Sequence, residues 1–148
     1  MSNKAWSLLV ILPLITGFCP NSIFAQQTAH VTGVSVEANP TSHDGPCPKL
    51  FKFTGVITVN RGGKVKYRWF HSDGKHRPPA STIFRGPEAH TITDTWTLGT
   101  SSTPFHYEGY VRLQILSPTT SLSDKATFTL NCVPRGPQKK TQTGKPKK

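Results

Sequence analysis

The side chains best suited to metal chemistry gather in one polar stretch, residues 71–79. It contains His71, Asp73 and His76, and imidazole and carboxylate groups are ligands of borderline divalent metals such as zinc. The spacing of the two histidines matches no closed zinc template, and no free cysteine is expected to join them. The stretch therefore supports two interpretations: a metal site that uses His71 and His76, or, as the commoner outcome, separate solvent-exposed histidines.

Catalytic machinery is not indicated by the other polar residues. An enzyme needs a nucleophile or an acid–base pair held on a defined frame. The chain has only 7 acidic residues and contains no G-x-S-x-G motif, no H-E-x-x-H motif and no glycine-rich phosphate loop. Asp94 stands out because it shares strand parity with Ile92 and Trp96, which predicts a buried hydrogen-bonding group or a β-bulge. We therefore expect a protein that is not an enzyme and needs no cofactor.

Aromatic side chains could instead stack on a ligand. Trp69 and Trp96 share parity with aliphatic neighbours, so we expect them to pack in a core. Tyr107 and Tyr110 follow a loop, where aromatic side chains can face solvent and recognise a partner. For these two tyrosines, core packing and surface recognition both stay open.

Charge is the feature that most restricts the partners of this chain. It has 18 lysines and arginines against 7 acidic residues, a net charge of +11, so polyanions are attracted to it. The expected partner is an acidic polymer, an anionic envelope surface or another protein, and the C-terminal charges could alternatively serve only solubility. The candidate polyanion-binding residues are Lys64, Lys66, Arg68, Arg135, Lys139, Lys140, Lys145, Lys147 and Lys148.

Composition divides the chain into three parts. Lys4, the apolar run over residues 5–18 and the stretch 22–25 predict a cleavable secretory signal over residues 1–25. The apolar run is shorter than the roughly 20 residues that cross a bilayer, so no transmembrane segment is expected. Residues 26–132 predict one folded domain, and residues 133–148, which are basic and nearly without apolar side chains, predict a disordered tail. The expected location is secreted or periplasmic.

The cysteines agree with export. Removal of residues 1–25 would leave Cys47 and Cys132, an even pair in an oxidising compartment. We expect these two residues to form a disulfide that contributes strongly to stability. The alternative is a pair of free, buried thiols.

The elements that must position these residues are short strands. With 13 prolines and 12 glycines the chain is rich in turns, and apolar residues alternate with polar ones between the turns. In one such segment Lys64, Lys66 and Arg68 take the face opposite the apolar residues, which predicts a half-buried strand with a basic outer side. Alternation predicts seven strands of an antiparallel sandwich, over residues 34–38, 51–59, 65–69, 82–85, 92–98, 107–116 and 126–132.

Four segments together carry a resemblance to a known family: GPCPKLFKFTGVITVNRGGKVKYRWFHSDG over residues 45–74, TDTWTLG over 93–99, VRLQILSP over 111–118 and KATFTLNC over 125–132. The chain resembles the immunoglobulin-like domain of bacterial exported proteins. The resemblance implies an all-β, seven-stranded antiparallel immunoglobulin-like sandwich, often a binding or spacer module. We expect an exported, monomeric, non-catalytic binding or adhesion module, with a loop-mediated protein-binding domain or a histidine-based metal-binding protein as alternatives.

Overall fold

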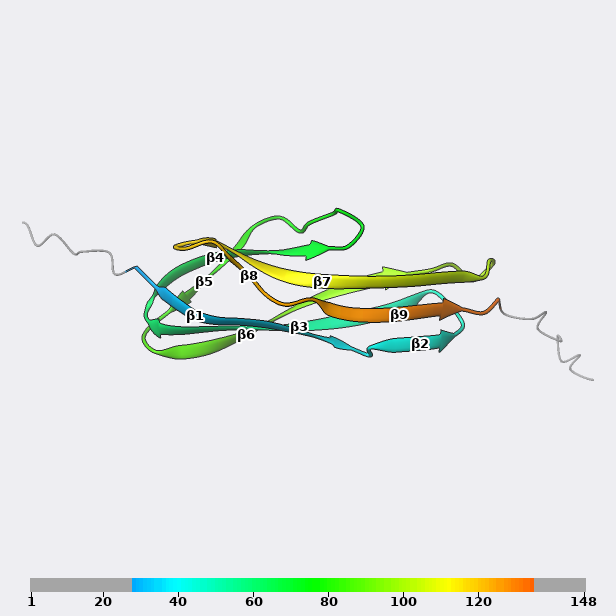
Figure 1. Ribbon diagram of the computed structural model, residues 1–148, viewed down its shortest axis with the longest axis horizontal. Helices are drawn as coiled ribbons and strands as arrows, with labels where there is room; N and C mark the ends of the chain where they lie inside the picture. Colours follow the sequence, from blue (N-terminus) through cyan, green and yellow to red (C-terminus); the bar gives the residue numbers. More distant parts are fainter. Residues whose placement is uncertain (1–27, 135–148) are drawn as a thin grey trace, which may run out of the picture.

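The computed structural model describes residues 28–134, and every regular element in that range is a β-strand (Figure 1). The all-β prediction is confirmed. The predicted signal and the tail from Arg135 onward, including five of the candidate lysines, lie outside the described residues. The strands are β1 His30–Asn39, β2 Ser42–Gly45, β3 Lys49–Arg61, β4 Gly63–His71, β5 Ala80–Phe84, β6 Glu88–Leu98, β7 Phe105–Ser117, β8 Ser121–Leu122 and β9 Ala126–Cys132.

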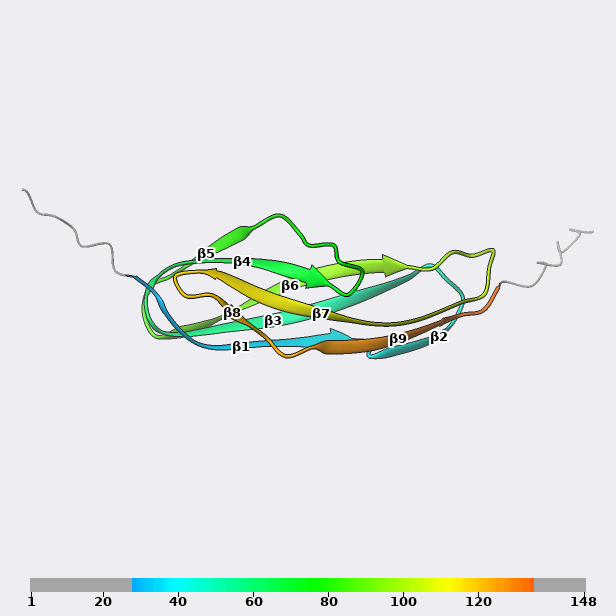
Figure 2. The ribbon, with the colours of Figure 1, turned by 45° about the horizontal axis from the view of Figure 1, so that its top comes forward.

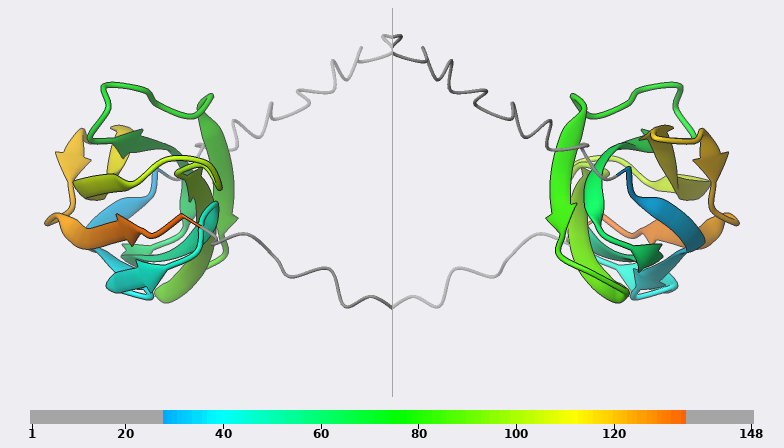
Figure 3. Two further views of the ribbon diagram at one scale, coloured as in Figure 1. Left: turned by 90° about the vertical axis from the view of Figure 1, so that its right-hand side faces the viewer. Right: turned by 90° about the vertical axis from the view of Figure 1, so that its left-hand side faces the viewer.

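The strands form two sheets that run along the long axis of an elongated body (Figures 1 and 2). One sheet has the order β1-β3-β6, and the other has the order β2-β9-β7-β4-β5 with β8 beside β7. Viewed from its ends, the molecule shows strands wrapped around a common centre (Figure 3). No helix long and apolar enough to cross a membrane occurs within residues 28–134.

The expectation of seven antiparallel strands was wrong in two respects. Seven of the nine strands in the described range, all except β2 and β8, match those predicted from alternation. The two missed strands have only 4 and 2 residues, which is too short to show an apolar alternation. In addition β2 pairs with β9 in parallel, from Ser42 opposite Thr129 to Gly45 opposite Cys132, which makes the larger sheet mixed.

The core lies between the inward faces of the two sheets. Phe51 and Phe53 of β3 are fully buried, and the ring of Phe128 on β9 packs against them at centroid distances of 4.5 and 5.5 Å. Trp69 is buried in this core and Trp96 packs against it, as their parity predicted. Burial of the inward residues explains why alternation located the long strands.

The predicted disulfide between Cys47 and Cys132 is present, with the two Cα atoms 5.4 Å apart. It joins the segment before β3 to the end of β9, and both cysteines are buried. Gly99 covers the bond with a φ of +80°, and a Cβ at this position would lie 2.8 Å from the Cys47 sulfur. Glycine is therefore required there for both its backbone conformation and its size.

Candidate ligand-binding groove on the outer face of the larger sheet

The candidate site begins with the basic side of β4. Val65 and Trp69 point into the core, so Lys64, Lys66 and Arg68 lie on the outer face of the larger sheet. Lys64 and Lys66 are exposed, whereas Arg68 is half-buried. The structure thus places the three basic residues of β4 together on one face.

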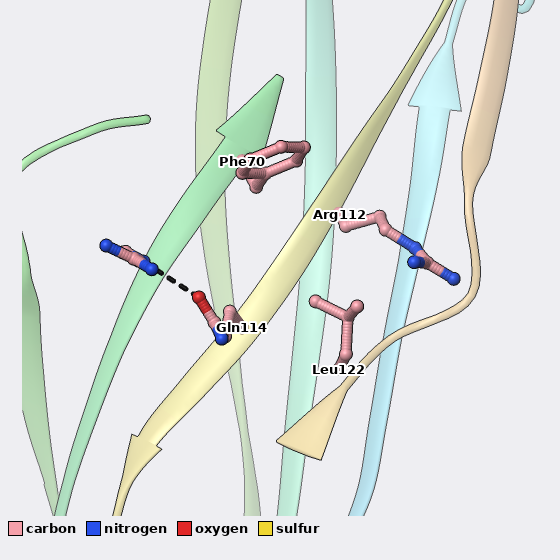
Figure 4. Close-up of a pocket in the computed structure, with 5 residues that line it drawn as sticks. Phe70, Arg112, Gln114 and Leu122 are labelled. Atoms are coloured by element: carbon pink, nitrogen blue, oxygen red, sulfur yellow. Dashed lines mark hydrogen bonds between the residues drawn. The ribbon is translucent and has the colours of Figure 1, made fainter. Parts of the chain in front are cut away.

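Neighbouring strands turn this basic row into a groove. Arg68 lies opposite Gln114 on β7, Phe70 lies opposite Arg112, and Gln114 in turn lies opposite Leu122 on β8. These five side chains line a hollow of about 320 Å³ on the outer face (Figure 4). We call it the β4–β7 groove. It combines cationic, amide and apolar side chains in one place.

Hydrogen bonding orders one side of the β4–β7 groove and leaves the other side incomplete. Arg68 Nε donates to Gln114 Oε1 over 2.8 Å, which holds both side chains against the sheet. Arg112 Nε is buried and has no hydrogen-bond partner within residues 28–134. A buried N–H without an acceptor costs free energy, whereas the rest of the half-buried Arg112 side chain lines the groove.

The face around the groove is positively charged. Lys64 and Lys66 flank it along β4, and the Lys125 ammonium lies 4.4 Å from the centroid of the Tyr110 ring. Glu108 lies farther along β7 on the same face, and Asp124 precedes Lys125 in the segment before β9. An acidic ligand would therefore find attraction at the groove itself.

Sequence patterns did not single out four residues of the groove: Phe70, Arg112, Gln114 and Leu122. A signal existed for Arg112 and Gln114, because they alternate with the buried residues Val111, Leu113 and Ile115. Alternation places them on an outer face but does not say which strand lies beside them. Leu122 belongs to the short strand β8, for which the sequence holds no such signal.

Tyr107 and Tyr110 take different positions. The Tyr107 hydroxyl lies 2.9 Å from Ser72 Oγ, and its ring packs near Phe128 with the centroids 6.1 Å apart. Tyr107 is thus a core-facing residue. Tyr110 is half-buried on the outer face beneath Lys125, where it borders a second shallow hollow.

A second polar cluster joins the two sheets. His71, at the end of β4, is only 4% exposed, and its Nε2 lies 2.7 Å from Asp94 Oδ2 on β6. A carboxylate only accepts hydrogen bonds, so His71 Nε2–H is the donor. Arg77 Nε donates to Asp94 Oδ1 over 3.0 Å, and the His71 ring stacks on Trp96 at 4.5 Å. Asp94 is thus the hydrogen-bonding residue its parity predicted, and its pairing with β3 shows no bulge.

This cluster changes the interpretation of the two histidines considered as metal ligands. His71 is buried and hydrogen-bonded, not a solvent-exposed loop residue, whereas His76 is exposed. Both line a hollow of about 320 Å³ that also carries Lys75 and Arg77. No group of three His, Cys, Asp or Glu residues is arranged to hold a metal ion in the part of the chain that the structure describes.

Asp94 should make stability depend on acid pH. Burial by itself raises the pKa of the Asp94 carboxyl, but the His71 hydrogen bond, the Thr95 backbone amide and the Arg77 charge outweigh burial and lower the pKa below 3.8. A carboxyl with a lowered folded-state pKa stabilises the fold above its unfolded pKa, and this contribution is lost as pH falls through the folded value.

Urea unfolding from about pH 7 to about pH 2 should therefore show a loss of stability below about pH 4 that is smaller in Asp94→Asn. Subtracting the stability-versus-pH curve of Asp94→Asn from that of the unaltered protein cancels the contributions of the other carboxyls. Two curves that stay parallel over the whole range would contradict the role of Asp94.

Comparison with known proteins adds evidence on the fold. No family model and no curated protein sequence matches this chain. Among solved structures, the CARDB domain of a Pyrococcus furiosus protein, in complex with di-metal ions, superposes with a TM-score of 0.50 at 15% identity. That alignment covers 73% of this chain and 96% of the domain. At this identity the similarity shows a shared fold alone, which is β-sandwich-like.

A second solved structure is more distant. The β-glucosidase EmGH1 of Erythrobacter marinus aligns with a TM-score of 0.47 and 10% identity, over 68% of this chain and 15% of the enzyme. Fold and site together define a disulfide-bonded, β-sandwich-like domain with a basic groove on the outer face of its larger sheet.

Proposed function

We propose that this chain is an exported, monomeric, non-catalytic binding or adhesion module whose β4–β7 groove attaches to an acidic ligand. The observation that carries the proposal is the meeting of Arg68 and Arg112 with Phe70 and Leu122 in one groove. Guanidinium groups bind carboxylate, sulfate and phosphate groups in a fork of two hydrogen bonds. Arg112 is half-buried and lines the groove, so its guanidinium is available in part for such a contact.

Two further observations support the proposal. The disulfide fits an oxidising compartment outside the cytoplasm. The sheet orders β1-β3-β6 and β9-β7-β4-β5 suit an immunoglobulin-like sandwich to which the short strands β2 and β8 are added. Such a frame presents a rigid sheet face, on which strand residues hold ligand groups more accurately than loops do.

Metal binding is the second candidate function, because the Pyrococcus furiosus domain was solved with di-metal ions. The residues of this chain do not favour it. His71 Nε2 is already engaged by Asp94, and the cationic Lys75 and Arg77 in the same hollow would repel a metal ion. We therefore favour the acidic ligand.

The test is binding to heparin, a soluble sulfated polymer, at low and moderate salt. The Lys64→Gln/Lys66→Gln double variant should bind about tenfold more weakly at low salt, because two charges beside the groove are lost. Lys49→Gln/Lys52→Gln, on β3 of the other sheet, removes the same charge and should change binding less than about twofold.

The C-terminal charges need a separate comparison. A chain ending at Pro134 keeps the hydrogen bond from Val133 N to Gly45 O and removes only residues outside the described range. If the shortened chain still binds and still responds to the β4 variants, the groove is the site. Binding that is unchanged by salt and by both double variants would contradict the proposal and point to the loops.

A further inference from the structure

The basic face also carries exposed aliphatic side chains. Ile83 on the edge strand β5 is 68% exposed and lies directly opposite Lys64. Leu122 is 48% exposed and lies at the wall of the β4–β7 groove. Exposed aliphatic side chains contribute little to the binding of a fully hydrated polymer. They contribute favourable free energy when binding buries them against an apolar part of the partner.

The cations on this face suit phosphate groups. Arg112 lines the β4–β7 groove and is half-buried, so part of its guanidinium is open to an oxyanion. Lys64 and Lys66 are exposed along the same face, and lysines at a membrane surface are attracted to anionic headgroups. Charge and exposed apolar surface thus coincide.

We propose that the acidic ligand of this face is the surface of an anionic phospholipid membrane. Arg112, Lys64 and Lys66 contact lipid phosphates, and Ile83 and Leu122 enter the boundary between headgroups and acyl chains. The inference rests on the proposed function and names its ligand class. Attachment of this kind combines apolar burial with attraction to anionic lipid and does not require a spanning segment.

The experiment is cosedimentation with vesicles of phosphatidylcholine alone or of phosphatidylcholine with phosphatidylglycerol, using the full exported chain and the chain ending at Pro134. Both chains should bind only the anionic vesicles, and more weakly at higher salt. Leu122→Ser and Ile83→Ser should each weaken vesicle binding about fivefold, the effect of burying half of an aliphatic side chain. Ile83→Ser, which changes a residue outside the β4–β7 groove, should leave heparin binding unchanged.

Two control variants remove the same kinds of side chain, one aliphatic and one charged, at positions away from the proposed membrane-binding face. Leu50→Ser removes an aliphatic side chain that is 55% exposed on β3 of the other sheet, and Lys52→Gln removes a charge from the same strand. Neither should alter vesicle binding by more than about twofold. Arg112→Gln should reduce binding to anionic vesicles and to heparin alike, because both present oxyanions.

The outcomes separate this inference from the proposed function. Heparin binding that depends on the β4 lysines, together with no binding to anionic vesicles, would overturn the membrane inference and leave the acidic-ligand proposal standing. Vesicle binding that is indifferent to Leu122→Ser and Ile83→Ser would also overturn it. If the unaltered chain binds neither vesicles nor heparin, both the membrane inference and the acidic-ligand proposal are overturned.

Discussion

Replacing both Cys47 and Cys132 by serine is expected to lower the free energy of unfolding by about 4–5 kcal/mol. The bond closes a loop with a sequence separation of 85, so it removes much conformational freedom from the unfolded chain. Native domains are stable by only about 5–15 kcal/mol, so the variant should be close to unfolding at room temperature.

Urea unfolding followed by tryptophan fluorescence measures this effect. The unaltered protein under reducing conditions is the matched control, because it loses the bond without any change of side chain. Both samples should show a similar loss of stability. A loss below about 1 kcal/mol in the variant would show that the strand pairing at this end of the molecule suffices without the bond.

Replacing Asp94 by alanine should cost about 3 kcal/mol. The Asp94 side chain is 11% exposed, and its two oxygens accept from His71 on β4 and Arg77 in the following loop. Its removal leaves a buried His71 Nε2–H without its acceptor and frees the loop that carries Arg77. The cluster connects the two sheets, so the loss should appear in global unfolding.

Asp94→Asn is the informative control, since it keeps one acceptor oxygen and should cost less than Asp94→Ala. Asp73→Ala removes a carboxylate whose partner is the exposed Lys75, and should cost less than about 1 kcal/mol. Thermal and urea unfolding of Asp94→Ala, Asp94→Asn and Asp73→Ala would rank their losses of stability. Equal stability of Asp94→Ala and Asp73→Ala would contradict the structural role of the cluster.

The two predictions concern the inward side of the molecule, whereas the proposed ligand site is on its outer face. Asp94→Ala should therefore leave heparin and vesicle binding unchanged wherever the variant is folded. This independence separates stability from function, because Lys64 and Lys66 are exposed and their substitution should hardly affect unfolding.

The sequence by itself determined the long strands and the faces of their residues. Alternation places Val65 and Trp69 inward and Lys64 and Lys66 outward, because burial on one side of a sheet imposes a period of two. The disulfide followed from the two cysteines left after the predicted signal. Asp94 was recognisable as a polar residue on an inward parity.

Only the tertiary structure decided which residues meet. The pairing of His71 with Asp94 joins residues 23 positions apart on different sheets, and the groove requires Phe70 and Arg112 to lie side by side. Alternation assigns a residue to a face of its own strand, whereas its neighbours depend on sheet order and register. Those are set by the packing of the whole chain, which is also why the short strands β2 and β8 escaped prediction.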